Sequence, residues 1–270
     1  MEPTAILKDT ITVQPTVINT TTNPMKKIFF FLIAAAFVLQ SCIINSEIVY
    51  HKDAASTAVT DINMKQFIAE MKAMTPDSLK QQKEFGEMDK LPTVWTSIFD
   101  IQKGEGKLNT TDPDSIRIMK KVFMKTTKEN NEPTGFSLKM EHFSQADYQI
   151  LNNYNKKEKL PFDQNIFNNW DGKTLTINTE NFNLKNIEET IKNKTSKDEA
   201  DKVEGMITLF FKSIGTTLKF ENKIKSITGK HDWVKQVDNY TIKIDYDLKT
   251  MYDQEAQFKN ADKAIVIVTE

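Results

Sequence analysis

The amino-acid sequence predicts an α+β fold, with a mostly antiparallel sheet and a long amphipathic helix packed on one face of that sheet. Several stretches alternate apolar with polar residues, which is the period of half-buried strands. One stretch, residues 199–214, instead repeats apolar residues at helical spacing. Neither an internal repeat nor a Pro- or Gly-rich linker divides residues 47–270, so we expect them to form one domain.

The expected strands are spread along most of the chain. Residues 47–50 and 58–62 are mostly apolar or β-branched and lie on either side of a polar turn, which predicts a hairpin. Residues 136–143 alternate apolar and polar side chains, and a strand at 173–178 follows an Asp-Gly turn. Further strands are expected at 216–221, 240–248 and 264–268.

The expected helices are recognised by their start signals and by their spacing. An Asp-Pro pair at 112–113 combines a capping residue with proline in the first turn, and helical spacing continues from there to Phe123. Ser196 and Glu199 form a capping box, which opens the strongest helix of the chain. The apolar stripe of that helix comprises Val203, Met206, Ile207, Phe210, Phe211 and Ile214.

The composition excludes several classes of protein. The chain has 270 residues, with 36 Lys+Arg against 37 Asp+Glu, a net charge of −1, three His and one Cys. The balanced charge argues against a nucleic-acid partner, because contacts to a phosphate backbone need a basic excess. A single cysteine excludes an internal disulfide and a Cys cluster for zinc or iron–sulfur. We expect neither a metal site nor a cofactor.

The only cysteine follows a segment with the architecture of a signal peptide. Met25-Lys26-Lys27 is a charged start, and residues 28–39 are a run of twelve apolar residues. As a helix this run is about 18 Å long, which is short for a bilayer core of about 30 Å. It therefore favours a cleaved signal over a permanent span.

Leu39-Gln40-Ser41-Cys42 resembles the lipobox of bacterial lipoproteins. The resemblance implies diacylglycerol on the Cys42 sulfur, cleavage before Cys42 and acylation of the new amine. An uncleaved anchor, or a secretory signal with an incidental Cys, are the alternatives. Asp does not follow Cys42, which by the sorting rules of the family implies the inner leaflet of an outer membrane, facing the periplasm. The outer leaflet of an inner membrane and the cell surface are the alternatives.

These features divide the chain into segments. Residues 1–24 are polar and Thr-rich, and we interpret them as an upstream segment that translation from Met25 would leave out, with a long n-region as the alternative. Residues 25–41 are the signal peptide, and 42–46 are the lipidated tether of a periplasmic domain. Within that domain, the charged and poorly patterned residues 77–133 are a candidate insertion.

Motifs of catalysis are missing from the sequence. It contains no G-x-S-x-G, no G-x-x-x-x-G-K-[ST] and no H-E-x-x-H. His51, His142 and His231 are far apart, and their spacing suggests neither a metal site nor a catalytic set. We therefore expect a protein that is not an enzyme, with no catalytic residue.

The apolar stripe of the predicted helix has two interpretations. It packs on the sheet as ordinary core, or it encloses with the sheet a cavity for an acyl chain, lined by Val203, Met206, Ile207, Phe210 and Phe211. Trp170 and Trp233 lie next to turns, and we expect them to cap the core rather than to sit at a membrane interface.

Residues 220–229 read Phe-Glu-Asn-Lys-Ile-Lys-Ser-Ile-Thr-Gly, and residues 239–248 run from Asn to Leu through an Ile-rich strand. Together they resemble a pattern of LppM-like bacterial lipoproteins, in which a strand with F/P-x-K-I-x-S-x-x-G leads through a loop to a second strand. The resemblance implies an α+β domain similar to lipid-binding or lipid-transfer folds. It defines no catalytic residue.

Three functional hypotheses follow. The first is a lipid-anchored, non-enzymatic envelope protein that binds a hydrophobic ligand or lipid. The second is a structural or assembly adaptor that acts through a protein surface on an envelope partner. The third is a hydrolase whose site is built from distant residues, which would gain support if His142 or His231 met a carboxylate at the floor of a cleft.

Overall fold

The computed structural model describes residues 42–74, 90–155, 169–182, 211–247 and 258–270, which belong to one structural unit, 37–270. The strands are β1 (Cys42–Tyr50), β2 (Ser56–Asn63), β3 (Thr96–Ser97), β4 (Val122–Glu129), β5 (Glu132–Phe143), β6 (Thr174–Asn178), β7 (Phe211–Phe220), β8 (Ile224–Thr228), β9 (Val234–Gln236), β10 (Thr241–Tyr246) and β11 (Ala264–Thr269). The helices are α2 (Lys65–Met74), α4 (Ile98–Gly104), α5 (Pro113–Lys121), α6 (Gln145–Asn155) and the short 3-10 helix η2 (Thr179–Asn181).

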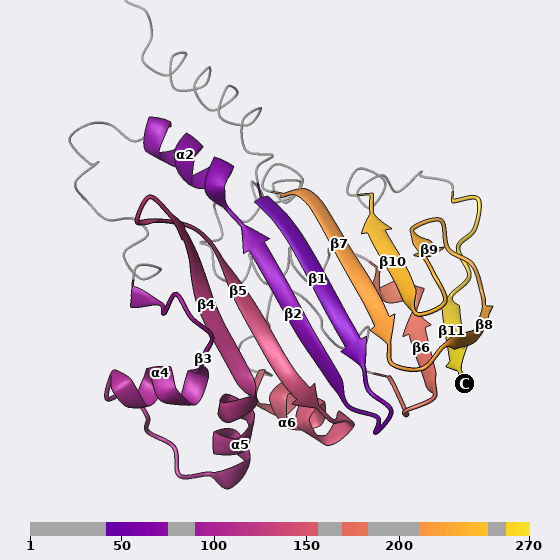
Figure 1. Cartoon of the computed structure of the whole chain (residues 1–270), viewed down its shortest axis with the longest axis horizontal. Coiled ribbons are helices and arrows are strands. Elements are labelled where there is room, and N and C mark those ends of the chain that lie inside the picture. The colour runs from indigo at the N-terminus through magenta and orange to yellow at the C-terminus, as the bar shows by residue number, and fades with distance from the viewer. Residues whose placement is uncertain (1–41, 75–89, 156–168, 183–210, 248–257) are drawn as a thin grey trace, which may run out of the picture. The chain divides into compact units, whose positions relative to one another are not determined.

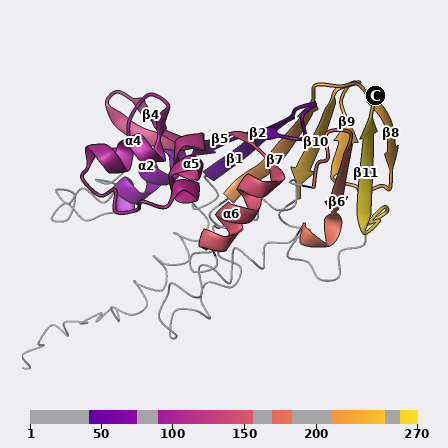
Figure 2. The same ribbon diagram turned by 90° about the horizontal axis from the view of Figure 1, so that it is seen from below.

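Two sheets organise these elements (Figure 1). The large sheet has eight strands in the order β3-β4-β5-β2-β1-β7-β10-β9, and the small sheet has three in the order β6-β11-β8. Figure 2 shows the small sheet beside β9 and β10 at one end of the large sheet, with α4, α5 and β4 at the other end.

The predicted hairpin at the start of the domain is confirmed. β1 and β2 pair antiparallel from Ile43↔Asn63 to Tyr50↔Ser56. Strands are also present where they were expected, at 136–143, 173–178, 216–221, 240–248 and 264–268, as β5, β6, β7, β10 and β11, although β10 is shorter than expected and ends at Tyr246. The Asp-Gly turn before β6 forms because the Asp171 carboxylate accepts the backbone N–H groups of Lys173 and Thr174.

The predicted fold class is wrong in two respects. The large sheet is mixed, because β1 and β7 pair in parallel along their whole length. Among the described residues there is no long amphipathic helix, and the longest helix, α6, has 11 residues. The helix expected at 199–214 falls partly outside the described residues, at 199–210, and from Phe211 onward the chain is the strand β7.

The pattern of burial explains why β7 is a strand. Its buried residues are Ile214, Thr216, Leu218 and Phe220, which is a period of two. Phe211 and Ile214 also fit the helical spacing of the apolar residues that begin at Val203. For this reason the predicted helix wrongly included both of them. Neighbours on both sides, β1 and β10, supply the backbone hydrogen bonds that fix the extended form.

The helix predicted after Asp112 is confirmed at its start and is too long at its end. The Asp112 side chain accepts from the backbone N–H of Ser115 at 2.7 Å, with Pro113 as the first helical residue. The helix ends at Lys121, and Phe123 belongs to β4. A tight turn then joins β4 to β5, and both of its central residues, Asn130 and Asn131, have positive φ angles.

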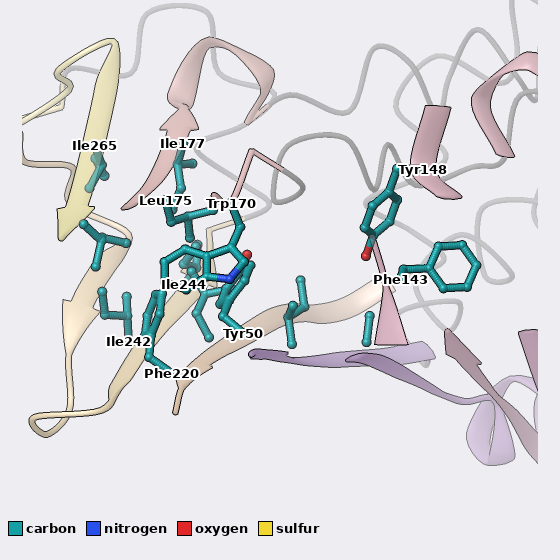
Figure 3. Packing of buried hydrophobic residues seen from close by; sticks show 14 of the residues in the cluster. Tyr50, Phe143, Tyr148, Trp170, Leu175, Ile177, Phe220, Ile242, Ile244 and Ile265 are labelled. Atoms are coloured by element: carbon teal, nitrogen blue, oxygen red, sulfur yellow. The ribbon is translucent and has the colours of Figure 1, made fainter. Parts of the chain in front are cut away.

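The main core lies where the small sheet faces the large one. Leu175, Ile177, Ile265 and Ile267 from the small sheet pack with buried residues of the large sheet (Figure 3). From the large sheet come Ile48, Tyr50, Leu218, Phe220, Ile242 and Ile244, while α5 and α6 add Ile118 and Tyr148. This end of the structure is therefore a small sandwich.

The helices of the described segments are short. In this part of the chain, no helix combines the length and the hydropathy that crossing a membrane requires. Residues 96–97 and 122–129, within the segment expected as an insertion, provide β3 and β4 at one edge of the large sheet.

Candidate functional site

Cys42, the predicted lipid-attachment residue, opens β1 and is buried. The residues expected as a tether, 42–46, are part of this strand. Cys42 precedes Ile44 by two residues, so both side chains lie on the same side of β1. The predicted attachment point thus lies at the end of a central strand of the sheet.

An apolar surface lies on that side of the sheet, next to Cys42. The register pairs Ile44 with Ile62 and Ile214, and the neighbouring strands continue the same face. We define the Cys42-end surface by its members from five strands, which are Ile44, Ile62, Met124, Phe136, Leu138 and Ile214. Of these, Ile44 and Ile214 are buried, and the other four are partly exposed.

On β1, β2 and β7, a polar row lies between the Cys42-end surface and the main core, and Leu138 and Met124 continue the line of this row on β5 and β4. The hydroxyl groups of Ser46 and Thr60 lie 3.0 Å apart and share a hydrogen bond, and Thr216 is buried beside Ser46 in the register. Among the described residues, the core cluster includes no member of the Cys42-end surface. On these three strands the face therefore carries two apolar regions, one on each side of the row.

The predicted cavity residues fall at the margin of this region. Val203, Met206, Ile207 and Phe210 lie outside the described residues. Phe211 is the first residue of β7 and pairs with Cys42 in the register, so it belongs to the sheet and not to a helix facing it.

Two of the three histidines meet at the turn between β1 and β2, at the other end of β1. Their rings lie 5.0 Å apart, centroid to centroid. His51 Nδ1 lies 2.8 Å from Glu221 Oε1, and its Nε2 lies 2.9 Å from Thr57 Oγ1. His142 Nε2 lies 2.8 Å from Asp53 Oδ2. Each imidazole is thus paired with its own carboxylate.

The two carboxylates are held ionised by these contacts. The pKa of Glu221 lies below its ordinary value because the carboxylate is hydrogen-bonded to His51 and accepts the backbone N–H of Lys52. The pKa of Asp53 is also lowered, first by the backbone N–H of Ala55 and then by His142. Both groups therefore offer a negative charge to the adjacent imidazole near neutral pH.

The order Glu221, His51, Thr57 places a carboxylate, an imidazole and a hydroxyl in a row, as nucleophilic triads do. Thr57 Oγ1 also accepts the backbone N–H of His142 at 3.1 Å, so its hydroxyl is held between two partners. Among the described residues, no set of three or more His, Cys, Asp or Glu side chains is placed to share a metal ion. The contacts of His51 and His142 join the β1–β2 turn to the ends of β5 and β7.

His231 lies apart from the other two, in an aromatic cluster. It is buried, and burial lowers its pKa. The backbone N–H of Trp233 donates to its Nδ1 at 3.2 Å, which suits a neutral ring. The rings around it are those of Phe182, Trp233 and Phe258. As expected, Trp170 and Trp233 belong to the core.

The sequence did not reveal which residues contact these histidine and tryptophan side chains. Glu221 is 170 residues from His51 in the chain, and no local pattern connects them. Trp95, the third tryptophan, follows exposed Val94 and carries two lysines over its ring, and only its neighbourhood in space reveals this.

Comparison with known proteins gives a limited result. No family model and no curated protein matches the sequence. Among solved structures, the chain is similar to the folded domain of the Mycobacterium tuberculosis LppM protein, solved by NMR, with a TM-score of 0.35 and 11% sequence identity. The match covers 87% of this chain and 92% of that one. At this level it transfers neither a site nor a ligand to the present chain.

Proposed function

We propose that this chain is a lipid-anchored envelope protein that binds a hydrophobic ligand, such as a lipid, without catalysing a reaction. The signal peptide and the lipobox-like residues 39–42 support the anchor. By the sorting rules of lipoproteins, the protein faces the periplasm from an outer membrane. The observation that carries the binding role is the Cys42-end surface.

The Cys42-end surface has the properties of a binding face for an apolar molecule. Four of its side chains remain partly exposed although they lie on the apolar face of the sheet: Ile62, Met124, Phe136 and Leu138. Covering one such side chain completely is worth about 1.5–3 kcal/mol. The polar row of Ser46, Thr60 and Thr216 limits the surface on the side of the core and offers hydroxyl groups to a polar head.

The lipid anchor is tested at Cys42. In cells fed an alkyne analogue of palmitate, we expect the wild-type chain to be labelled and the Cys42→Ser chain to carry no label, because serine lacks the thiol that takes the lipid. The Ser41→Ala chain, which keeps a small residue at the cleaved bond, serves as the control and should be labelled. Labelling of Cys42→Ser equal to wild type would contradict the anchor.

The binding role is tested at Leu138. A fluorescent palmitate analogue, titrated into the purified mature protein, should bind about tenfold more weakly to Leu138→Asn, since one leucine contact is worth about 1.5 kcal/mol. Val237→Ser, which changes an exposed apolar residue beyond the end of β9, should leave the affinity unchanged. Urea unfolding of both variants controls for stability. Equal affinities in two folded variants would refute binding at this surface.

A further inference from the structure

A second unusual surface lies at the β3 edge of the large sheet, around Trp95. Its ring has Lys125 Nζ at 4.7 Å and Lys139 Nζ at 5.5 Å from its centroid. Lys139 Nζ also lies 4.4 Å from the centroid of Phe123. Val94, next to Trp95, is 68% exposed. We define the Trp95 patch by these residues: Val94, Trp95, Phe123, Lys125 and Lys139.

The patch is on the polar face of the sheet, opposite the Cys42-end surface. Phe123 pairs with Lys139 in the register, and Lys125 is two residues further along β4, so the three side chains share a face. Other lysines on that face are paired with carboxylates: Lys219 with Glu47 at 2.7 Å, Lys243 with Asp245 at 3.0 Å and, within the patch, Lys139 with Glu141 at 2.9 Å. The described residues offer Lys125 no such carboxylate.

The chain around the patch is basic. Residues 90–128 contain eight Lys and Arg against four Asp and Glu, a net charge of +4, whereas the net charge of the whole chain is −1. An exposed valine and a half-exposed tryptophan in the middle of such a region combine apolar with basic groups. This is the composition that anionic bilayer surfaces attract, since tryptophan favours the interface and lysine favours the lipid phosphates.

The patch lies within reach of the bilayer that would hold Cys42. Four strand spacings, from β1 through β2, β5 and β4 to β3, separate the two across the sheet, which is about 19 Å. Along the strands, Thr96 is level with Ser46, four residues beyond Cys42, which adds about 13 Å. The separation is therefore about 23 Å, less than the width of the domain's large sheet.

We propose that the Trp95 patch docks on an anionic lipid surface. Lys125 contacts the phosphate groups of the lipids, while Trp95 and Val94 enter the boundary between headgroups and acyl chains. The docking sets the orientation of the protein on the membrane. It extends the proposed function but does not depend on ligand binding, and the anchor serves only to bring the patch close.

The test uses the environment of Trp95. The other two tryptophans, Trp170 and Trp233, are buried, so Trp95 is the one that a bilayer can reach. The processed, lipidated protein is reconstituted in vesicles with brominated acyl chains, either containing phosphatidylglycerol or made of phosphatidylcholine alone. We expect quenching of tryptophan fluorescence in the anionic vesicles, and its loss in Trp95→Phe.

Matched charge variants make the test specific. Lys125→Gln should weaken docking about fivefold, as expected for one lysine near an anionic surface. Lys243→Gln removes the same charge from the same face but from a lysine paired with Asp245, and it should leave quenching unchanged. Equal quenching in the two kinds of vesicle, or in Lys125→Gln and wild type, would overturn the proposal.

Failure of the anchor gives a different result. In that case the protein does not float with phosphatidylcholine vesicles in a density gradient. Docking is then measured by adding the same anionic vesicles to the unanchored protein, with the same expected order of the variants. Flotation without quenching would leave the anchor in place and refute the patch.

Discussion

Replacing Asp147 by asparagine is expected to lower the free energy of unfolding by about 2–4 kcal/mol, because a buried carboxylate loses its charge and its cationic partners. Asp147 is 1% exposed and lies in the first turn of α6. Its Oδ2 accepts from Lys121 Nζ at 2.7 Å and from the backbone N–H of Ser144 at 3.0 Å, and its Oδ1 accepts from Arg117. Urea unfolding measures the loss.

The position of Asp147 explains the size of the effect. Ser144 Oγ accepts the backbone N–H of Asp147 at 3.3 Å, so the two residues cap the start of α6 reciprocally. Arg117 and Lys121 come from α5, so the same carboxylate also holds α5 against α6. Asparagine keeps one acceptor oxygen but neither the charge nor the second acceptor.

The control for Asp147 is a second aspartate bound to the same arginine. Asp114 lies 3.0 Å from Arg117 and is exposed, so Asp114→Asn should cost less than about 1 kcal/mol. A loss as large as that of Asp147→Asn would contradict the role given to burial and to the cap.

The effect of Asp147 depends on pH. Its pKa is lowered in the folded protein: burial opposes the charge, but the hydrogen bonds of Lys121 and Ser144 outweigh it. A lowered pKa stabilises the fold above the pKa of the unfolded chain, about 3.9, and this stabilisation is lost as the pH falls through the folded value. The difference between wild type and Asp147→Asn should therefore be constant from about pH 7 to pH 5 and shrink below about pH 4.

Local features of the fold could be predicted because their causes are local. The β1–β2 hairpin joins neighbouring segments, and the cap at Asp112 needs only the next few residues. The alternation at 136–143 located β5, although the buried residues of this strand, which include Ser137 and Met140, fall on both of its faces. The same reasoning placed Trp170 and Trp233 in the core.

The mixed sheet could not be predicted, since it depends on a contact between distant segments. Tyr50 pairs with Phe220, and the other pairs of the parallel ladder join residues with a similar separation in the chain. Parallel pairing leaves no turn signal in the sequence, unlike a hairpin. The apolar positions Phe211 and Ile214 fit both a helix and a strand, and the partners β1 and β10 decided between them.

The candidate sites could likewise be predicted only where their residues are close together in the sequence. Cys42 could be proposed from the sequence because the pattern before it, a charged start followed by an apolar run, is contiguous. The pairing of His51 with Glu221, and the lysines over Trp95, arise only when β1, β4, β5 and β7 come together in one sheet.

Trp170 connects the core with the histidine pair, and its replacement by alanine should lower the free energy of unfolding by about 3–5 kcal/mol. Its ring packs against Tyr50 at 5.3 Å and Phe220 at 5.6 Å between centroids (Figure 3). Its Nε1–H donates to the backbone carbonyl of His51 at 2.8 Å. Alanine removes a large buried side chain and this hydrogen bond together, and urea unfolding measures the sum.

Trp170→Phe separates the two contributions. Phenylalanine keeps most of the packing but cannot donate to His51, so we expect a loss of about 1–2 kcal/mol. The carbonyl of His51 keeps one donor, the backbone N–H of Ala54, at 3.2 Å, and this limits the cost. Trp95→Phe, at a half-exposed site, should cost less than about 0.5 kcal/mol. A loss for Trp170→Phe as large as for alanine would mean that the hydrogen bond to the β1–β2 turn, rather than the packing, holds this part of the fold together.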